Sequence, residues 1–291
     1  MQALISGFTF VKSGLTLGYP IKESIESLEP LCDQVVITVG FDDPDLKTDD
    51  GTYQYLRDHF RHKKFLFQKS FWNPKMAAEG FLLAQQANCS LRECRGKYCQ
   101  FLHADEVLHE NELFKIHNAV IEMEKNPKIQ GLLFNYKHFY GNCDTIKHSA
   151  DIYRREVRLI RNHIGTKALQ NIQGFKGPND EKLLCQSVDA QIFHYGLALK
   201  NEFLKLRNDH LKKLLPKYQA HNEYEHVWGL KEFIGSHPRS MQSWIEQNKN
   251  ELAPLKLPPK HHVKNLFFAA SDVIENLTGI RLGEYKSYKH Y

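Results

Sequence analysis

Acidic and histidine side chains stand at the ends of three apolar, strand-like runs in this sequence. They are Asp42 and Asp43 after the run 34–39, His103, Asp105 and Glu106 after 98–102, and His194 at the end of 189–194. Ligands of open α/β sheets bind beyond the carboxyl ends of the strands, where strand order reverses. These three strand ends are therefore the candidate sites of chemistry.

The run HADE (103–106) carries two carboxylates out of a predicted buried strand. Burying them costs free energy unless they are paired or bound to a metal. Mg²⁺ or Mn²⁺ would neutralise a diphosphate through carboxylate and phosphate oxygens. The imidazole of His194 could complete such a site or contact phosphate, and both motifs end strands of one predicted sheet. A solvated turn at 103–106 and a structural role for His194 remain open alternatives.

The acidic residues after the run 34–39 allow two interpretations. Asp42 or Asp43 could accept hydrogen bonds from a base or a ribose, or could stabilise a turn. Asp49 and Asp50, just before Gly51, favour the cap of a helix.

Strand-like and helix-like runs alternate through the first hundred residues. The predicted strands are 3–11, 34–39, 64–67 and 98–102, and the predicted helices begin near 21, begin near 52 and cover 76–94. This series predicts a parallel sheet with right-handed crossovers and helices on both faces. The later predicted elements are a helix over 110–124, strands over 130–140, 156–161 and 189–194, and a helix over 200–215.

Composition limits the class of protein. The length of 291 residues, of which 42% are hydrophobic, indicates one large domain or a domain with a modest extension. The net charge is +5. Acidic and basic residues are interspersed, which argues against a nucleic-acid-binding protein. No pair of the six cysteines has C-x-x-C spacing, and we expect them to be buried, reduced thiols in a cytosolic protein. No run of 18 apolar residues exists, so we expect no membrane-spanning segment. The N-terminus lacks the features of a signal peptide.

Several motifs together resemble the family 2-like glycosyltransferases of the GT-A fold. They are SGFTFVK (6–12), DGT (50–52), the helix ending in QAN (86–88) and the strand leading into HADE (103–106). Later segments, among them LLFNYKHFYGNCDT (132–145) and FHYGLALKNE (193–202), resemble a bacterial, cell-surface saccharide branch of the family. The resemblance extends over nearly the whole chain.

The resemblance implies a Rossmann-like αβα sandwich with a C-terminal extension. The GT-A domain would cover 1–215, with a nucleotide-binding half at 1–108 and an acceptor-binding half at 109–215, followed by a mostly helical extension at 216–291. The resemblance places these residues at the nucleotide: Thr9, Val11, Asp42, Asp43, Asn88 and His103.

The same resemblance implies a metal site for Mn²⁺ or Mg²⁺. Asp105 corresponds to the last Asp of the Asp-x-Asp element and is expected to hold the metal, with Glu106 and His194 as further ligands. His103 stands where the family has the first Asp; a neutral imidazole can also ligate Mn²⁺.

The expected reaction transfers a sugar from a nucleotide-diphosphate donor to the hydroxyl of a saccharide or lipid-linked acceptor. Inversion at the anomeric carbon requires one base. Asp144 is the first candidate and Glu156 the second, although Arg154, Arg155 and Arg158 around Glu156 could indicate an ion pair instead. The expected setting is cell-surface polysaccharide or lipopolysaccharide assembly, in the cytoplasm or at the inner face of the membrane.

Two alternatives remain open from the sequence. A nucleotidyltransferase would need a Gly-rich phosphate loop, which KSGLTLG (12–18) matches only loosely, and a non-catalytic nucleotide-sugar-binding protein would explain the change to His103. The basic face of the helix 200–215 could be solvated or contact phosphate. Apolar positions between 263 and 277 could pack on the catalytic domain or contact a membrane surface.

Overall fold

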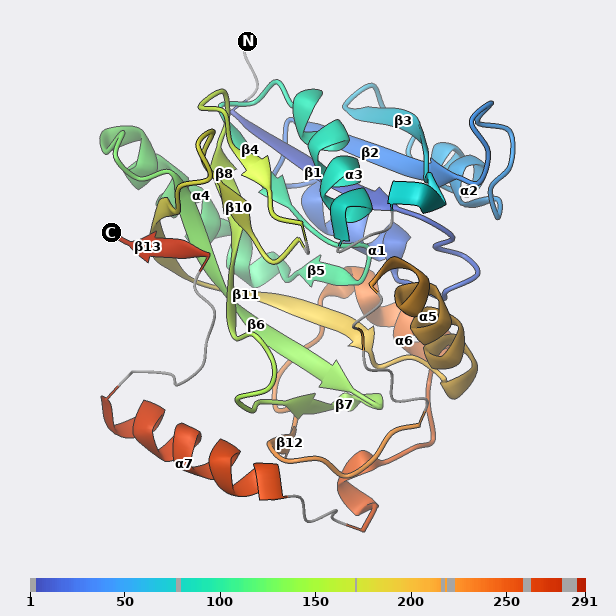
Figure 1. The fold of residues 1–291 in the computed structure, drawn as a ribbon, viewed down its shortest axis with the longest axis vertical. Helices are drawn as coiled ribbons and strands as arrows, with labels where there is room; N and C mark the ends of the chain where they lie inside the picture. The colour runs from blue at the N-terminus through green and yellow to red at the C-terminus, as the bar shows by residue number, and fades with distance from the viewer. Residues whose placement is uncertain are drawn as a thin grey trace.

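The computed structural model describes residues 4–76, 80–170, 172–215, 218, 223–258, 263–278 and 287–291. An 11-stranded sheet runs through the molecule in the order β12-β7-β6-β8-β4-β1-β2-β3, with β11 beside β6 (Figure 1). The second, two-stranded sheet consists of β9 (Lys167–Ala168) and β10 (Phe175–Lys176).

The first half of the sheet is parallel. Its strands are β1 (Ile5–Val11), β2 (Gln34–Phe41), β3 (Phe65–Phe71) and β4 (Tyr98–Phe101), joined through α1 (Ile21–Leu28), α2 (Thr52–His59) and α3 (Phe81–Arg92). The parallel pairs are β1 with β2, β1 with β4, and β2 with β3. All four strands begin and end within a few residues of their predicted positions.

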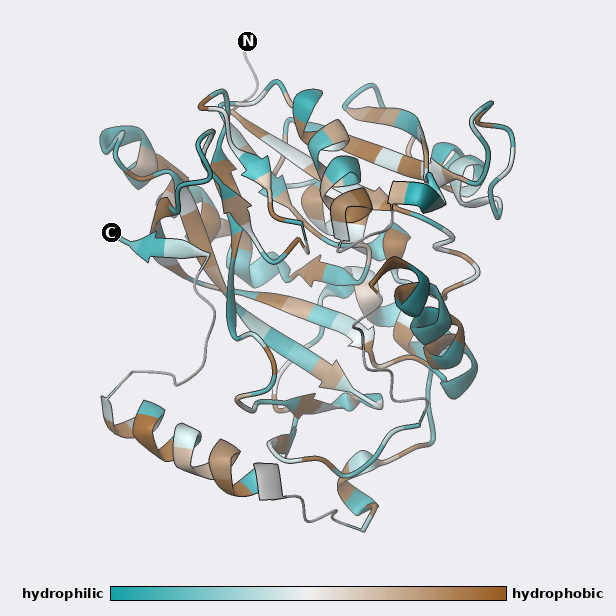
Figure 2. Ribbon diagram, viewed as in Figure 1, coloured by the Kyte–Doolittle hydropathy of each residue, from teal (hydrophilic) through white to brown (hydrophobic). Residues whose placement is uncertain are grey.

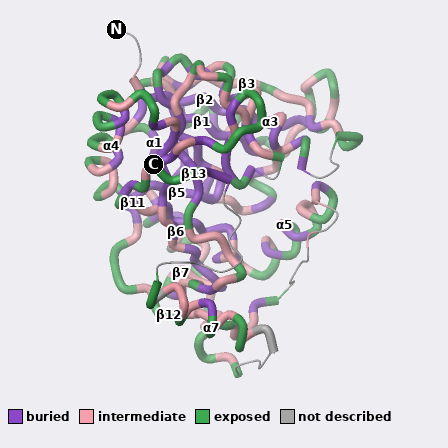
Figure 3. The backbone as a smooth tube through the Cα atoms, turned by 60° about the vertical axis from the view of Figure 1, so that its left-hand side comes forward, coloured by how far each residue is buried: buried purple, intermediate pink, exposed green. Residues whose placement is uncertain are grey.

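Alternating side chains of β2 pack on opposite faces of the sheet. Val35 and Ile37 belong to the apolar cluster that contains Ile25 of α1, whereas Val36 belongs to the cluster that contains Leu82 of α3. Successive side chains of a strand point to opposite faces, so helices cover both sides of the sheet. The predicted α/β class with a Rossmann-like αβα half is confirmed. Figure 3 shows the buried residues concentrated on these central strands.

The second half of the sheet mixes directions. Its elements are β5 (Glu106–Leu108), α4 (Leu113–Lys125), β6 (Gly131–Tyr140), β7 (Asn142–Lys147), β8 (Arg155–Arg161), β11 (Leu183–Leu197) and α5 (Asn201–Leu214). β8 is antiparallel to both β4 and β6, while β11 is parallel to β6 and antiparallel to β5. The sequence analysis missed β5 and β7.

The C-terminal part contains short elements that return to the sheet. They are β12 (Leu230–Glu232), α6 (Gln242–Gln247), α7 (Val263–Thr278) and β13 (Tyr288–His290), with 3₁₀ turns at Arg239–Met241 and Pro254–Lys256. β12 pairs with β7 and β13 pairs with β11. Residues beyond the predicted boundary at 215 therefore complete the main sheet.

Two predicted helices are shorter than expected. The helix predicted over 76–94 is observed as a 3₁₀ turn at Pro74–Met76 and α3 from Phe81, with 77–79 outside the described residues. Gly80 precedes α3 with a φ of 81°, a left-handed conformation that ends any continuous helix there. The helix predicted from 110 begins with a 3₁₀ turn, Glu110–Glu112, and the side chain of His109 caps this turn by accepting a hydrogen bond from the amide of Asn111.

Hydropathy follows the layers of the fold. In Figure 2 hydrophobic residues mark the central strands, while much of α5 is hydrophilic.

All six cysteines are free thiols, and four of them are buried. Within the described part of the chain, no helix is both long and apolar enough to span a membrane.

Candidate active site

The ends of several strands surround one cavity of about 400 Å³. Residues that follow β1, β3 and β4 line it together with residues of β6, β11 and α5. Its polar and aromatic lining includes Phe10, Lys12, Tyr19, Trp72, His103, Asp105, His138, Tyr153, Gln173, His194, Arg207, His210 and Tyr218. The cavity thus lies beyond the carboxyl ends of the parallel strands, as expected for this kind of sheet.

Asp105 and His194 meet in this cavity although 89 residues separate them in the sequence. The distance from His194 Nε2 to Asp105 Oδ2 is 3.3 Å, and both residues are buried. The amide of Tyr195 donates to the carbonyl of Asp105 at 2.9 Å, which ties the strand end of β11 to the turn after β4. Gly196 allows this approach, because a Cβ there would overlap both side chains.

Electrostatics keep Asp105 ionised. Burial raises the pKa of the Asp105 carboxyl, but the charge and hydrogen bond of His194 outweigh burial and hold this pKa well below its usual range. Asp105 is therefore a carboxylate at neutral pH, directed at an imidazole nitrogen.

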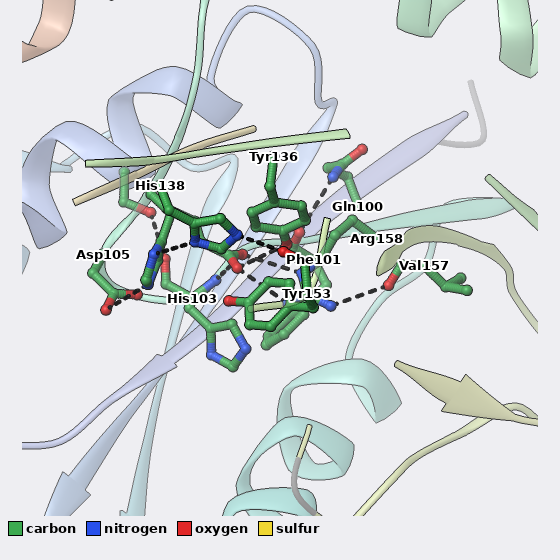
Figure 4. Close-up of polar contacts among 12 residues, drawn as sticks. Gln100, Phe101, His103, Asp105, Tyr136, His138, Tyr153, Val157 and Arg158 are labelled. Atoms are coloured by element: carbon green, nitrogen blue, oxygen red, sulfur yellow. Dashed lines mark hydrogen bonds and ion pairs between the residues drawn. The ribbon is translucent and has the colours of Figure 1, made fainter. Parts of the chain in front are cut away.

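A chain of hydrogen bonds decides which nitrogen of His194 carries hydrogen (Figure 4). His138 Nε2 lies 2.7 Å from the carbonyl of Tyr153, which can only accept, so this nitrogen must donate. Burial and the neighbouring His194 lower the pKa of His138 to about 3, so its ring is neutral and its Nδ1 is an acceptor. His194 Nδ1, 2.9 Å away, must then be the donor to His138.

It follows that His194 turns its other nitrogen, Nε2, to the Asp105 carboxylate, and that Nε2 carries either a proton or a lone pair. Two lone pairs at 3.3 Å repel each other unless a proton or a metal cation lies between them. A carboxylate oxygen and an unprotonated imidazole nitrogen are ligands that Mn²⁺ accepts, so this pair fits a metal. Among the described residues, no group of three or more His, Cys, Asp or Glu could hold a metal ion, so metal binding by this pair stays a prediction.

Glu106 faces away from this pair. Its carboxylate accepts hydrogen bonds from Arg158 at 3.1 and 3.2 Å, from Tyr136 Oη at 2.8 Å and from the amide of His103 at 2.9 Å. Burial raises the pKa of Glu106, but Arg158 outweighs burial and lowers this pKa to about 2. Because Glu106 is occupied and does not line the cavity, this geometry favours a role in holding the 103–106 turn, and its metal ligation stays a prediction.

His103, which stands where the family has an Asp, lines the cavity beside Asp105. Its ring packs edge-on against Phe101, with ring centroids 4.8 Å apart. Burial lowers the pKa of His103, so a neutral imidazole faces the cavity.

Arg207 brings a positive charge to the cavity wall. It was predicted on the basic face of the helix 200–215, whose Lys205, Lys212 and Lys213 are exposed as expected for a solvated face. Arg207 instead turns inward, donates to Tyr218 Oη at 3.1 Å, and has a buried Nε without a hydrogen-bond partner. A buried guanidinium nitrogen without a partner is a candidate contact for an anionic ligand.

The residues predicted at the nucleotide are distributed unevenly. Val11 lines the cavity, whereas Thr9 is fully buried and its carbonyl accepts from Ser90. Asp42 accepts a hydrogen bond at 2.6 Å from Lys12, which itself lines the cavity.

Asp43 and Asn88 do not line the cavity. The Asp43 carboxylate accepts hydrogen bonds from the amides of Lys47 and Thr48, as expected for a turn, and these bonds lower its pKa although burial opposes them. Asn88 accepts from the amide of Ala168 at 2.9 Å and lines a separate cavity near β9. Nucleotide contacts of Asp43 and Asn88 stay predictions.

The two candidate bases are also absent from the cavity lining. Asp144 is exposed on β7. Glu156 is buried on β8, and Arg158 beside it pairs with Glu106. The assignment of either residue as the base stays a prediction.

The sequence analysis missed several lining residues, among them His138 and Trp72. His138 lies on β6 two residues after Tyr136, whose hydroxyl bonds to Glu106, and this period of two in NYKHFY could have indicated a common face. Trp72 directly follows β3, so the strand-end criterion used for the other sites could have found it.

Comparisons with known proteins find only limited similarity to this chain. No protein family matches the chain, and no curated protein matches it. Matching solved structures include S. aureus TarS in complex with UDP, with 16% identity and a TM-score of 0.36 over 48% of this chain and 37% of that chain. The TarS complex with UDP-GlcNAc has 18% identity and a TM-score of 0.34, over 48% of this chain and 36% of that chain. The structure of TarS without a named ligand has 13% identity and a TM-score of 0.40, over 72% of this chain and 40% of that chain. The match thus spans about two fifths or less of these chains, and at these values the ligands of TarS carry no implication for this protein.

Proposed function

We propose that the chain is a GT-A-type glycosyltransferase that binds a nucleotide-diphospho-sugar in the cavity. The observation that carries this proposal is the buried pair of Asp105 and His194, which faces a cavity with a cationic wall. Such a wall suits a diphosphate, since the charge on its oxygens needs neutralisation.

The diphosphate would lie between the cations of the cavity and this pair. Arg207 has an unpartnered Nε for a phosphate oxygen, and the Lys12 ammonium lines the same cavity. Asp105 and His194 would hold Mn²⁺ or Mg²⁺, which stabilises the charge of the departing nucleoside diphosphate when bound. The hydrogen bond between His194 Nδ1 and His138 leaves Nε2 as the nitrogen that faces the cation.

The base of the nucleotide would pack at the aromatic part of the cavity. Phe10 and Trp72 lie next to each other there, with ring centroids 6.2 Å apart, and Val11 adds an apolar surface. Flat aromatic surfaces favour stacking of a base without specifying which base. We propose a saccharide or lipid-linked acceptor, inversion at the anomeric carbon, and a role in cell-surface polysaccharide assembly, as the sequence resemblance implies.

A thermal-shift screen tests the proposal. UDP, GDP, CDP, CMP and dTDP are each added with and without Mn²⁺ to the wild type and to Asp105→Asn. A ligand present at about 100 times its dissociation constant adds about 2.7 kcal/mol to the free energy of unfolding. We expect a Mn²⁺-dependent increase in Tm with one nucleoside diphosphate, absent in Asp105→Asn. No shift with any nucleotide would favour a protein of this fold that has lost donor binding.

Arg207→Met is expected to separate ligand binding from stability. Loss of a charge-assisted hydrogen bond of about 1.5–3 kcal/mol should weaken nucleoside diphosphate binding by about 10- to 150-fold. The Tm of the free protein should change little, because Arg207 loses one hydrogen bond, to Tyr218 Oη, and its buried Nε has no partner to lose. Lys205→Met, an exposed change on the same helix, serves as the control. Isothermal titration would contradict the assignment if both variants bound the nucleotide like the wild type.

A further inference from the structure

The helix α7 contacts the rest of the protein through its polar side. Arg154 donates to Asp272 at 2.8 Å and also pairs with Glu275. Trp228 Nε1 donates to Asp272 at 3.0 Å, and Ser271 is buried. These contacts hold one side of α7 against the body of the molecule.

The opposite side of α7 is apolar and exposed. Leu266, Ala270, Val273 and Leu277 follow the spacing i, i+4, i+7 and i+11, which places them on one face, and all four are exposed, as is the neighbouring Phe267. Leu266 and Leu277 are 75% and 81% exposed. α7 lies at the edge of the molecule, outside the sheet, and shows hydrophobic residues between hydrophilic ones (Figures 1 and 2). A surface helix normally buries such a stripe, so this one is available to a partner.

Basic residues occur on both sides of this stripe in the sequence. They are Lys256, Lys260 and Lys264 at its N-terminal end and Arg281 and Lys286 beyond its C-terminal end, where Glu284 is the one acidic residue between them. Both acidic residues of α7 are paired with Arg154. The segment therefore combines an apolar stripe with an excess of positive charge, which is the combination that binds anionic lipid surfaces.

The size of the stripe argues against a second copy of the chain as the partner. The 16 residues of α7 span ~24 Å at ~1.5 Å per residue, so a stripe ~10 Å wide covers only ~240 Å². A stable interface buries ~800 Å² on each partner. We infer that α7 docks the protein onto an anionic lipid surface, with the apolar stripe inserted at the boundary between headgroups and acyl chains.

The residue that anchors α7 is next to a cavity residue in the sequence. Arg154, which anchors α7, directly follows Tyr153, whose side chain lines the cavity. The inference concerns α7 alone and holds whether or not the cavity transfers a sugar.

Vesicle sedimentation of the full chain tests the inference. The vesicles contain phosphatidylcholine with about 30% phosphatidylserine, or phosphatidylcholine alone. We expect the wild type to bind the anionic vesicles, and the double variant Leu266→Glu/Leu277→Glu to bind at least about tenfold more weakly. Phe114→Glu is the matched control, because Phe114 is 74% exposed on α4 and the change is the same. This control should bind like the wild type.

Four outcomes of the binding assay would overturn the inference. They are no binding of the wild type to anionic vesicles, equal binding to neutral vesicles, undiminished binding of the double variant, and an equal loss in Phe114→Glu. A dimer in solution that the double variant dissociates would also overturn it, since α7 would then be an interface between copies. Thermal unfolding of each variant establishes that it is folded, and exposed substitutions of this kind change stability by about 0.5 kcal/mol or less.

Discussion

Arg158→Met is expected to lower the free energy of unfolding by about 3–5 kcal/mol, because it leaves a buried carboxylate without its cation. Arg158 and Glu106 are both almost completely buried, and their ion pair connects β8 to the turn after β4. Urea denaturation at pH 7 measures the loss.

The double variant Glu106→Gln/Arg158→Met is the control for this prediction. It removes the isolated charge as well as the pair, so it should lose less stability than Arg158→Met alone. A double variant less stable than the single one would show that the two side chains contribute separately.

The pH dependence of this pair has a defined sign. Arg158 overcomes the effect of burial and lowers the folded-state pKa of Glu106 from 4.5 to about 2. A pKa that is lower in the folded state stabilises the protein above the unfolded-state value, and this contribution is lost as pH falls from about 4.5 toward 2. Wild type should therefore lose stability between pH 5 and about pH 3 more steeply than the double variant.

Asp105→Asn and His194→Ala are each expected to reduce turnover of the donor sugar by at least about 100-fold. Both side chains would act on one bound cation, so turnover by the double variant should be little lower than turnover by the less active of the two single variants. The rate of nucleoside diphosphate release, measured with a saturating sugar donor of the nucleotide that the thermal-shift screen identifies, tests this double-variant comparison.

Asp58→Asn is the matched control for the charge change, because Asp58 is exposed on α2 and lies outside the cavity lining. Its turnover should equal that of the wild type. If the effects of Asp105→Asn and His194→Ala multiplied in the double variant, the two side chains would act independently, and a shared cation would be excluded.

The sequence was sufficient to predict the parallel half of the sheet and the meeting of Asp105 with His194. Periodicity located the strands, and the general rule on strand ends indicated where polar side chains would meet. The opposite orientations of Asp105 and Glu106 were not predicted. The turn 103–106, closed by a hydrogen bond from the amide of Glu106 to the carbonyl of His103, directs Asp105 to the cavity and Glu106 to Arg158.

Other parts of the site depended on contacts that no local pattern contains. The spacing of Lys205, Arg207 and Lys212 does not show which of them turns inward, because the answer depends on where α5 packs. The arginines around Glu156 suggested a local ion pair, yet Arg154 pairs with Asp272, more than a hundred residues away. β13 was missed because three polar residues form a strand only where a partner edge exists.

The pairing of β13 with β11 has a consequence for biosynthesis. One edge of β11 at Leu183–Cys185 is covered by Tyr288–His290, whose Tyr288 belongs to the same apolar cluster as Leu183. The ribosome adds about a hundred residues after Leu183 before it reaches this strand, which takes ~5–20 s at ~5–20 residues per second. During that time the nascent chain presents an open strand edge to the cytosol or to chaperones, so slowing translation of the last third of the message should increase aggregation of this protein.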